Sequence, residues 1–425
     1  GACAGGPRRA GLWALGVGTD PEAERFWPQW RGPYANGVSR TADPPLEWSE
    51  AKNIRWKIEI PGRGSSSPVV WGDRLFVTTA IPMGVTGAAA HEPRGPIQPR
   101  DVHQFRILAI DRRTGRVVWE RNPRQEQPRA PSMKDGTWAS SSAITDGRRV
   151  FAFFDSSGLY AYDMQGTQLW EKSFGDKKIF AEVGESGSTP VLYGDRLVVV
   201  WDHQGASFIV ALNASTGQEL WRTERQDVDS WGTPLVVEHD GRAQVVTTGD
   251  KQVRSYDLET GRLVWETDGL NMNPIPSPVA EDGLVFVTAG FRSSRLHAIR
   301  LADARGNIAG SSAIVWSLDR DTPYVSSPLL YDGVLYFLKS NAGILSAFDA
   351  RSGRPHYRAQ RLTGMPEVYS SPVGAQGRVN ITSRDGATLV IRHGPRFEVL
   401  ATNTLDDGFD ASPALVDEEL YLRGN

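Results

Sequence analysis

Aromatic and carboxylate side chains that precede a recurring Ser-Pro-like motif have the clearest capacity for binding chemistry in this sequence. Carboxylates attract cations, and aromatic faces stack against cations or sugars. A ring of such side chains around one opening would suit a cation, a sugar or a basic peptide. The candidates are Arg63, Trp138, Glu185, Asp229, Trp231, Asn273, Asp321, Tyr324, Glu367, Tyr369 and Asp410.

Residue patterns for common enzyme chemistry are absent from the sequence. It contains no G-x-S-x-G, H-E-x-x-H, P-loop or EF-hand motif. Seven histidines are scattered without metal-ligand spacing; His91 and His103 share one segment and could pair on a metal, but a solvated loop is favoured. The single cysteine, Cys3, excludes a disulfide framework and a thiolate cluster. We therefore predict no catalytic residues and no metal site.

Composition restricts the classes of partner and fold. The formal net charge is −3, so the chain has no basic footprint for nucleic acid. No apolar run approaches the roughly 18 residues that a membrane-spanning helix needs. The 44 glycines and 27 prolines, with β-branched and aromatic runs between them, favour an all-β protein rich in turns.

The elements that must position the candidates are short strands in a repeat. Residues 324–357 read as four strands separated by Asp-Gly, Asn-Ala-Gly and Ser-Gly turns. Eight such copies follow one another, 41 to 50 residues apart except for 75 between the first two. Their reference positions are Pro68, Ala143, Pro190, Pro234, Pro278, Pro328, Pro372 and Pro413.

A second landmark closes most copies: a small residue, Asp or Asn, a Gly turn and then a Trp. Eight four-stranded units at this period predict an eight-bladed β-propeller of antiparallel blades, in which stacking buries both faces of each blade. We expect the tryptophans to pack between blades rather than to bind ligand. They are Trp119, Trp170, Trp221, Trp265 and Trp316, with Tyr357 in the same place later.

The two ends of the repeat array are expected to meet. The eighth copy has only two strands before Asn425, whereas Asn53–Ile60 alternates apolar and charged residues and carries Trp56 where other blades carry their Trp. We predict that this N-terminal strand is the outermost strand of blade eight and closes the ring. One strand of blade eight is then unaccounted for, and we expect the natural chain to continue beyond Asn425.

Residues 26–425 are predicted to form one domain, with 26–60 as an arm and closing strand. Residues 1–25 are interpreted as a disordered leader or signal remnant, and Cys3 as a possible lipidation site. The insertion at 81–106 is rich in Gly and Pro, and long loops of this kind are often functional. We predict that it binds a partner protein through Met83, His91, Arg94 and His103.

The A-x-D…TG…xxW repeat resembles that of pyrroloquinoline-quinone (PQQ) propellers. The arm WPQWRGPYANGVS and the following WKIEIPGRGSSSPVVWGDRLFVTTA look like bacterial extracytoplasmic PQQ-binding-like β-propeller repeat proteins, which are similar to BamB-type outer-membrane assembly lipoproteins. The resemblance covers residues 27–425 and implies the propeller fold and an extracytoplasmic location. It leaves function open, because this architecture hosts both enzymes and scaffolds.

Three functions remain open at this point. The leading one is a non-catalytic, monomeric scaffold, secreted or lipid-anchored, that binds a protein or small ligand at the channel mouth and needs no cofactor. The second is a PQQ- and calcium-dependent oxidoreductase, although the vicinal cysteines of the related alcohol dehydrogenases are missing. The third is a carbohydrate-binding module. An alternative for the candidate residues is that the aromatics plug the channel and the carboxylates cap turns.

Overall fold

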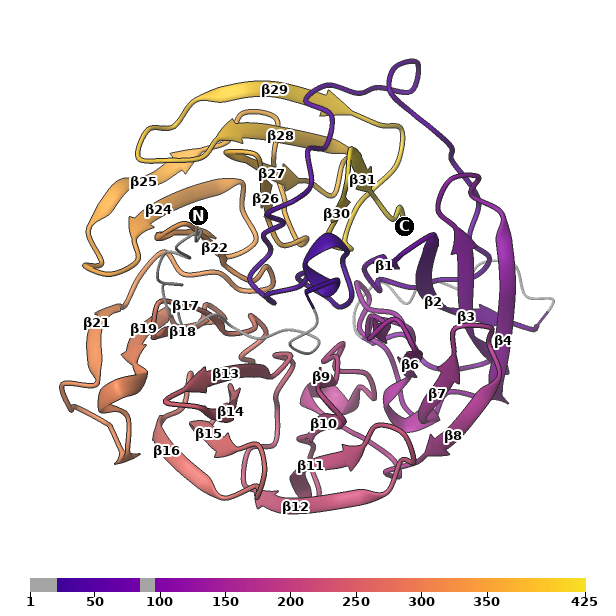
Figure 1. Cartoon of the computed structure of the whole chain (residues 1–425), viewed down its shortest axis with the longest axis horizontal. Helices are drawn as coiled ribbons and strands as arrows, with labels where there is room; N and C mark the ends of the chain where they lie inside the picture. Colours follow the sequence, from indigo (N-terminus) through magenta and orange to yellow (C-terminus); the bar gives the residue numbers. More distant parts are fainter. Residues whose placement is uncertain (1–20, 85–95) are drawn as a thin grey trace, which may run out of the picture.

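The computed structural model describes residues 21–84 and 96–425, and its strands form eight sheets arranged in a ring (Figure 1). Each complete sheet is a four-stranded antiparallel meander whose first strand faces the axis of the ring. Neighbouring blades contact each other through these inner strands, and β30 of the last blade contacts β1 of the first. The predicted eight-bladed β-propeller is confirmed.

The strands of the first four blades are as follows. Blade one has β1 (Val69–Trp71), β2 (Arg74–Pro82), β3 (His103–Asp111) and β4 (Val117–Glu126). Blade two has β5 (Ile144–Thr145), β6 (Arg149–Phe153), β7 (Leu159–Asp163) and β8 (Gln168–Lys172). Blade three has β9 (Val191–Tyr193), β10 (Arg196–Trp201), β11 (Ser207–Asn213) and β12 (Glu219–Arg225). Blade four has β13 (Leu235–His239), β14 (Arg242–Thr247), β15 (Gln252–Asp257) and β16 (Leu263–Asp268).

The remaining blades complete the ring. Blade five has β17 (Val279–Glu281), β18 (Leu284–Ala289), β19 (Arg295–Arg300) and β21 (Ile314–Leu318). Blade six has β22 (Leu329–Tyr331), β23 (Val334–Leu338), β24 (Ile344–Asp349) and β25 (Pro355–Arg361). Blade seven has β26 (Val373–Ala375), β27 (Arg378–Thr382), β28 (Ala387–Arg392) and β29 (Val399–Thr404). Blade eight has β30 (Ala414–Val416) and β31 (Glu419–Tyr421).

Four 3-10 turns and one short strand interrupt this plan. The turns are η1 (Ala23–Arg25), η2 (Asp155–Ser157), η3 (Phe180–Glu182) and η4 (Leu301–Asp303). The extra strand, β20 (Gly306–Asn307), leaves blade five and pairs in parallel with β16 of blade four. No helix within 21–84 and 96–425 has the length and apolar character needed to cross a bilayer.

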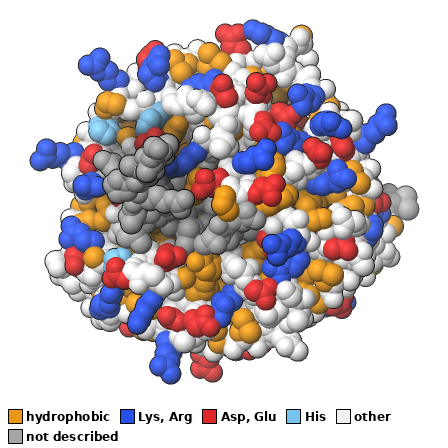
Figure 2. Space-filling view, viewed as in Figure 1, with side chains coloured by type: hydrophobic (Ala, Val, Ile, Leu, Met, Phe, Trp, Pro, Cys, Tyr) orange, Lys and Arg blue, Asp and Glu red, His pale blue; other side chains and the backbone are white. Residues whose placement is uncertain are grey.

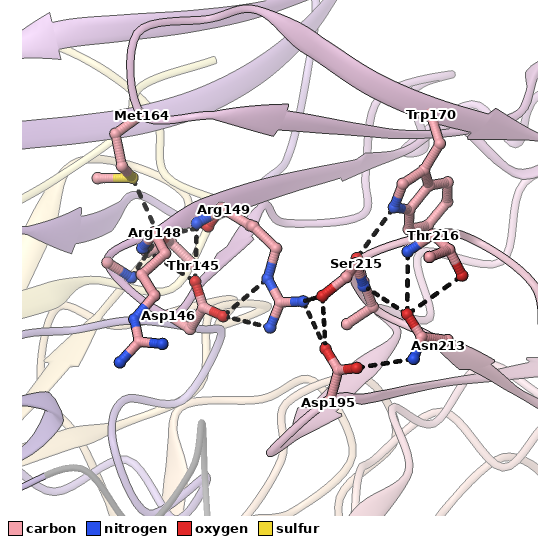
Figure 3. Close-up of polar contacts among 12 residues, drawn as sticks. Thr145, Asp146, Arg148, Arg149, Met164, Trp170, Asp195, Asn213, Ser215 and Thr216 are labelled. Atoms are coloured by element: carbon pink, nitrogen blue, oxygen red, sulfur yellow. Dashed lines mark hydrogen bonds and ion pairs between the residues drawn. The ribbon is translucent and has the colours of Figure 1, made fainter.

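Four of the five recurring tryptophans bond to the next blade, and the fifth, Trp265, is fully buried in the core shared by blades four and five. The indole of Trp170 in blade two donates to the carbonyl of Ala214 in blade three at 2.9 Å, beside the Arg149–Asp195 ion pair (Figure 3). A Cβ added to Gly217 would lie 2.7 Å from the Trp170 ring, so only glycine fits at that turn. Trp119, Trp221 and Trp316 repeat the carbonyl bond at 2.9–3.0 Å. The structural role predicted for these rings is confirmed.

A ring of hydroxyl groups joins all eight blades near the axis. In each blade the backbone N–H of the residue before the reference position donates to the hydroxyl of the equivalent residue in the next blade, at 2.8–3.1 Å. The last bond runs from Ser412 back to Ser67 and closes the circle. Its members are Ser67, Ser142, Thr189, Thr233, Ser277, Ser327, Ser371 and Ser412.

The N-terminal arm lies over the centre of the ring (Figure 1). Trp27 is fully buried and bridges to Val70 of β1, whereas the buried Arg31 donates to the carbonyls of Pro328 and Pro372. The folded domain begins before residue 26, where it was predicted to start. The 3-10 helix η1 lies within the expected leader, and Ala23 packs in the same core as Trp27. Cys3 and residues 1–20 lie outside the described residues.

The predicted closing strand Asn53–Ile60 is wrong as a strand but right in position. These residues pair with no strand among the described residues, and a strand requires a hydrogen-bonded neighbour. The alternation nevertheless holds, since Trp56, Ile58 and Ile60 pack against the core shared by blades one and eight. The Trp56 indole donates to Arg112 O at 2.8 Å and its ring covers Gly115 of blade one, just as Trp119 and Trp170 each cover a turn glycine of the following blade.

The predicted insertion at 81–106 is shorter than expected. Strand β2 runs to Pro82 and β3 begins at His103, because Pro82 and His103 still pair across the hairpin. His103 is 7% exposed and packs 4.8 Å from the ring of Trp138, so it is not free to contact a partner. Met83 is exposed, and His91 and Arg94 lie outside the described residues.

Candidate functional site

A cavity of about 1090 Å³ lies at blade eight. One wall is Asn53–Ile60 and the opposite wall is β31 with the residues that follow it. Its floor is apolar, with Leu75, Val77 and Ile110 of blade one. Between these walls the other seven blades carry their third strand, so this cavity occupies the third-strand position of blade eight.

The cavity reaches the end of the axis at which the inner strands begin, which we call the mouth. Arg63, Lys134 and Asp135 line it there, together with Arg384 and Asp410. Asp135 precedes the inner strand of blade two, whereas Arg384 follows β27 of blade seven, and the two form an ion pair at 3.2 Å. The segment before β5 therefore reaches over blades one and eight to contact blade seven.

Arg384 is the centre of a charged cluster at the mouth. Its guanidinium bonds both oxygens of Asp410 at 2.6 and 3.1 Å, and lies 3.4 Å from a Glu367 oxygen. It also stacks 4.0 Å from the ring centroid of Tyr369. Burial raises the pKa of Asp410, and burial raises the pKa of Tyr369 to about 12. Three carboxylates thus share one arginine.

Glu185 holds the segment that carries Asp135. Its Oε1 accepts the backbone N–H of Met133 at 3.0 Å, and the side chain is 8% exposed. Burial raises the pKa of Glu185 to about 8, so the carboxyl group is mostly protonated at neutral pH. The indole of Trp138 donates to Ala130 O, which is a second hydrogen bond that holds the segment carrying Asp135.

Aromatic side chains form a second group at the mouth. Tyr324 stacks on Phe291 with centroids 4.8 Å apart, and Phe180 meets Phe291 edge-on at 6.2 Å. The Tyr324 hydroxyl contacts the side chain of Asn273, which is 2% exposed. These rings contact one another, which is the behaviour expected of a plug rather than of a free stacking platform.

The eleven residues predicted for the mouth therefore separate into groups. Arg63 and Asp410 line the cavity, and Glu367 and Tyr369 contact Arg384. Asp321 forms ion pairs with Lys339 and Arg358, both in or beside blade six. Trp138, Glu185, Asn273 and Tyr324 are engaged as described above. Asp229 interacts with Gln204, and Trp231 bonds through its backbone to Pro274 O.

The sequence pattern did not reveal Arg384 or its contact with Asp135. Arg384 lies in the turn between the second and third strands of its blade, whereas the predicted candidates all lie before first strands. In an antiparallel meander, the turn between strands two and three lies at the same end of the blade as the start of strand one. The charged run Thr-Ser-Arg-Asp-Gly at 382–386 falls in such a turn, and this position could have identified Arg384 as a residue of the mouth. No cluster of three or more metal-binding side chains occurs within the described part of the chain.

The chain belongs to the PQQ-type repeat family described as outer membrane protein assembly factor BamB, whose profile matches residues 46–210, 155–311 and 206–423. It is 23% identical over 380 residues to BamB of Burkholderia pseudomallei, covering 83% of each chain. It is 27% identical over 206 residues to a 1-butanol dehydrogenase (quinone) of Thauera butanivorans, covering 44% of this chain and 30% of that enzyme.

Solved structures support the same fold. BamB from Moraxella catarrhalis aligns with a TM-score of 0.55 at 14% identity, covering 81% of this chain and 97% of its own. A europium-containing methanol dehydrogenase aligns with a TM-score of 0.62 at 11% identity, covering 92% and 87%. The resemblance predicted from the repeats is thus confirmed, and it includes both assembly factors and dehydrogenases.

Proposed function

We propose that this chain is a non-catalytic, extracytoplasmic β-propeller that binds another polypeptide. The observation that carries the proposal is the match of the family profile described as outer membrane protein assembly factor BamB, which extends over residues 46–210, 155–311 and 206–423. The relatives named BamB support the role and the location outside the cytoplasm.

The charged side chains on the face of the ring drawn in Figure 2 are compatible with protein binding. Figure 2 shows Lys or Arg and Asp or Glu side chains interspersed over the visible face rather than separated by sign. Mixed charge of this kind does not form the continuous positive surface that nucleic acid requires. At the mouth, Arg384 is already paired with carboxylates and serves the protein's own structure.

The second candidate is a PQQ-dependent oxidoreductase, which the similarity to a quinone-linked butanol dehydrogenase favours. PQQ carries three carboxylates and requires cationic partners. The charged cluster at the mouth fits it poorly, because Asp135, Glu367 and Asp410 already pair with Arg384, although Arg63 and Lys134 also line the mouth. A bound polyanion would have to compete with these carboxylates for the guanidinium.

Binding of a permanently unfolded polypeptide tests the proposal. Fluorescently labelled, reduced and carboxymethylated α-lactalbumin should bind saturably in an anisotropy titration. Met83→Asp, at the exposed residue after β2 in the segment predicted to bind a partner, should weaken binding at least tenfold. The matched control Leu169→Asp, at a similarly exposed apolar position on β8, should leave it unchanged. The absence of saturable binding to the parent would overturn the proposal.

A dye-linked dehydrogenase assay with added PQQ and calcium tests the second candidate. The proposal expects no dye reduction above background with a series of primary alcohols. Dye reduction that depends on PQQ, together with no binding of the unfolded polypeptide, would replace the scaffold with the enzyme.

A further inference from the structure

Blades four and seven carry matching side chains at the mouth. Glu367 and Tyr369 lie four and two residues before the ring hydroxyl of blade seven, and Asp229 and Trp231 lie at the same two places in blade four. The hydroxyl ring runs through every blade, so equal spacing from it places equivalent residues at the same depth along the axis. The two blades can therefore be compared position by position.

Blade seven completes this arrangement with a cation of its own. Residues 383–386 join its second and third strands, and Arg384 of this connection stacks 4.0 Å from the ring centroid of Tyr369. The same guanidinium lies 3.4 Å from a Glu367 oxygen and bonds both oxygens of Asp410. An aromatic face and carboxylates together satisfy the flat surface and the charge of an arginine.

Blade four has the carboxylate and the aromatic residue but lacks the cation. Its connection, 248–251, has the same length as 383–386, and Gly249 stands where Arg384 stands in blade seven. A Cβ on Gly249 would lie 2.1 Å from Asp227 Oδ1, so no side chain fits at this position. Blade four therefore cannot supply the cation in the way that blade seven does.

Two carboxylates at this place have no basic partner. Asp250 Oδ1 accepts the backbone N–H of Val228 at 3.0 Å, which brings its carboxylate next to Asp229. Neither aspartate forms an ion pair with the residues that the structure describes, whereas Asp321 of blade six pairs with Lys339 of its own connection at 3.0 Å. Burial raises the pKa of Asp229, and repulsion from Asp250 raises it further. A cation bound between the two would relieve this repulsion.

Buried oxygen atoms around the two carboxylates also lack hydrogen-bond donors. Asp229 Oδ1, Thr248 Oγ1 and Asn273 Oδ1 have no partner in the described part of the chain, and Thr248 and Asn273 are 1% and 2% exposed. Thr248 Oγ1 faces the entry segment of blade four, since a Cβ on Gly232 would lie 2.3 Å from it. Asn273 holds the place of Asp229 in blade five. Unpaired acceptors beside uncompensated carboxylates favour a ligand that carries both N–H groups and positive charge.

We propose that the mouth of blade four binds an arginine side chain of the partner polypeptide, with the guanidinium against Trp231 and paired with Asp229 and Asp250. Blade seven holds its own Arg384 in the equivalent way. Trp231 is half-buried, so its ring can be reached from solvent. Arginine is expected rather than lysine, because a planar guanidinium stacks on a ring while it pairs with carboxylates. This inference rests on the proposed function and adds the chemistry of the residue that is recognised.

A capped amino acid tests the site without a polypeptide. N-acetyl-arginine amide at millimolar concentrations should shift the indole N–H resonance of Trp231 saturably, and Trp231→Phe identifies that resonance by its loss. N-acetyl-citrulline amide, which has nearly the same shape without the charge, should cause no saturable shift. Asp229→Asn should weaken arginine binding about fivefold, and the remaining indole resonances report that the variant is folded. The matched control Asp282→Asn, at an exposed carboxylate at the opposite end of blade five, should leave binding unchanged.

The outcomes separate this inference from the proposed function. If carboxymethylated α-lactalbumin binds but N-acetyl-arginine amide does not shift Trp231, the arginine site is wrong and the proposed function stands. If the capped arginine binds and the polypeptide does not, the proposed function fails and the site remains. Equal affinity for N-acetyl-citrulline amide or N-acetyl-lysine amide would overturn the assignment of arginine, as would unchanged binding to Asp229→Asn.

Discussion

Replacing Ser412 by alanine tests whether the hydroxyl ring holds the propeller closed. Ser412 Oγ accepts the backbone N–H of Ser371 at 2.9 Å, and both residues are buried. Without the hydroxyl that N–H has no acceptor in the ring, and an unsatisfied buried donor costs about 1–3 kcal/mol. With an unfolding entropy of about 2.1 cal/mol/K per residue, a chain of this length should lose roughly 1–3 °C in melting temperature.

Differential scanning calorimetry of matched variants provides the measurement. Ser412→Thr keeps the hydroxyl, and threonine already occupies the equivalent position as Thr189 and Thr233. We expect Ser412→Thr to melt within about half a degree of the parent. If Ser412→Thr and Ser412→Ala fall equally, the loss comes from packing at this position, and the reasoning about the hydroxyl ring is refuted.

Two further predictions concern closure and pH. Trp56→Ala should destabilise the protein by about 2–4 kcal/mol in urea unfolding, because it removes the ring over Gly115 and the bond to Arg112 O; a loss no larger than that of the exposed control Leu169→Ala would contradict a closing role. Glu185 has a folded-state pKa of about 8 against an ordinary 4.5, so the stability it contributes is complete below pH 4.5 and is lost as the pH rises through 8. The free energy of unfolding of Glu185→Gln should equal that of the parent near pH 4.5 and exceed it by up to about 4 kcal/mol at pH 9, as measured by thermal melts. If the difference between the two proteins does not change with pH, the prediction is wrong.

The propeller could be predicted from the sequence because its information is local and repeated. Each Ser-Pro start, Gly turn and Trp lies within one copy of the repeat. Because there are eight copies, the pattern can be recognised even though single copies depart from it. The Gly turns have a physical cause, since a side chain at Gly217 or Gly115 would collide with the ring of the preceding blade. The closing position of Trp56 followed from the same pattern, although the strand around it did not form.

The site could be predicted only in part. The candidates were chosen by their place before each inner strand, as residues of the channel mouth, and two of them, Arg63 and Asp410, line the cavity there. It could not show that Asp135 reaches blade seven, because that contact joins residues 249 positions apart and depends on the path of one irregular segment. The cavity arises between two segments at opposite ends of the sequence, and its width is a property of the assembled ring.

The hydroxyl ring has an electrostatic consequence that distinguishes it from other repeated hydrogen bonds. In an α-helix, aligned bonds add to a dipole and leave unsatisfied groups at each end. In this circle all eight N–H groups donate in the same sense around the axis, so their components tangential to the ring sum to zero and no member is first or last. An ion on the axis would gain nothing from these tangential components.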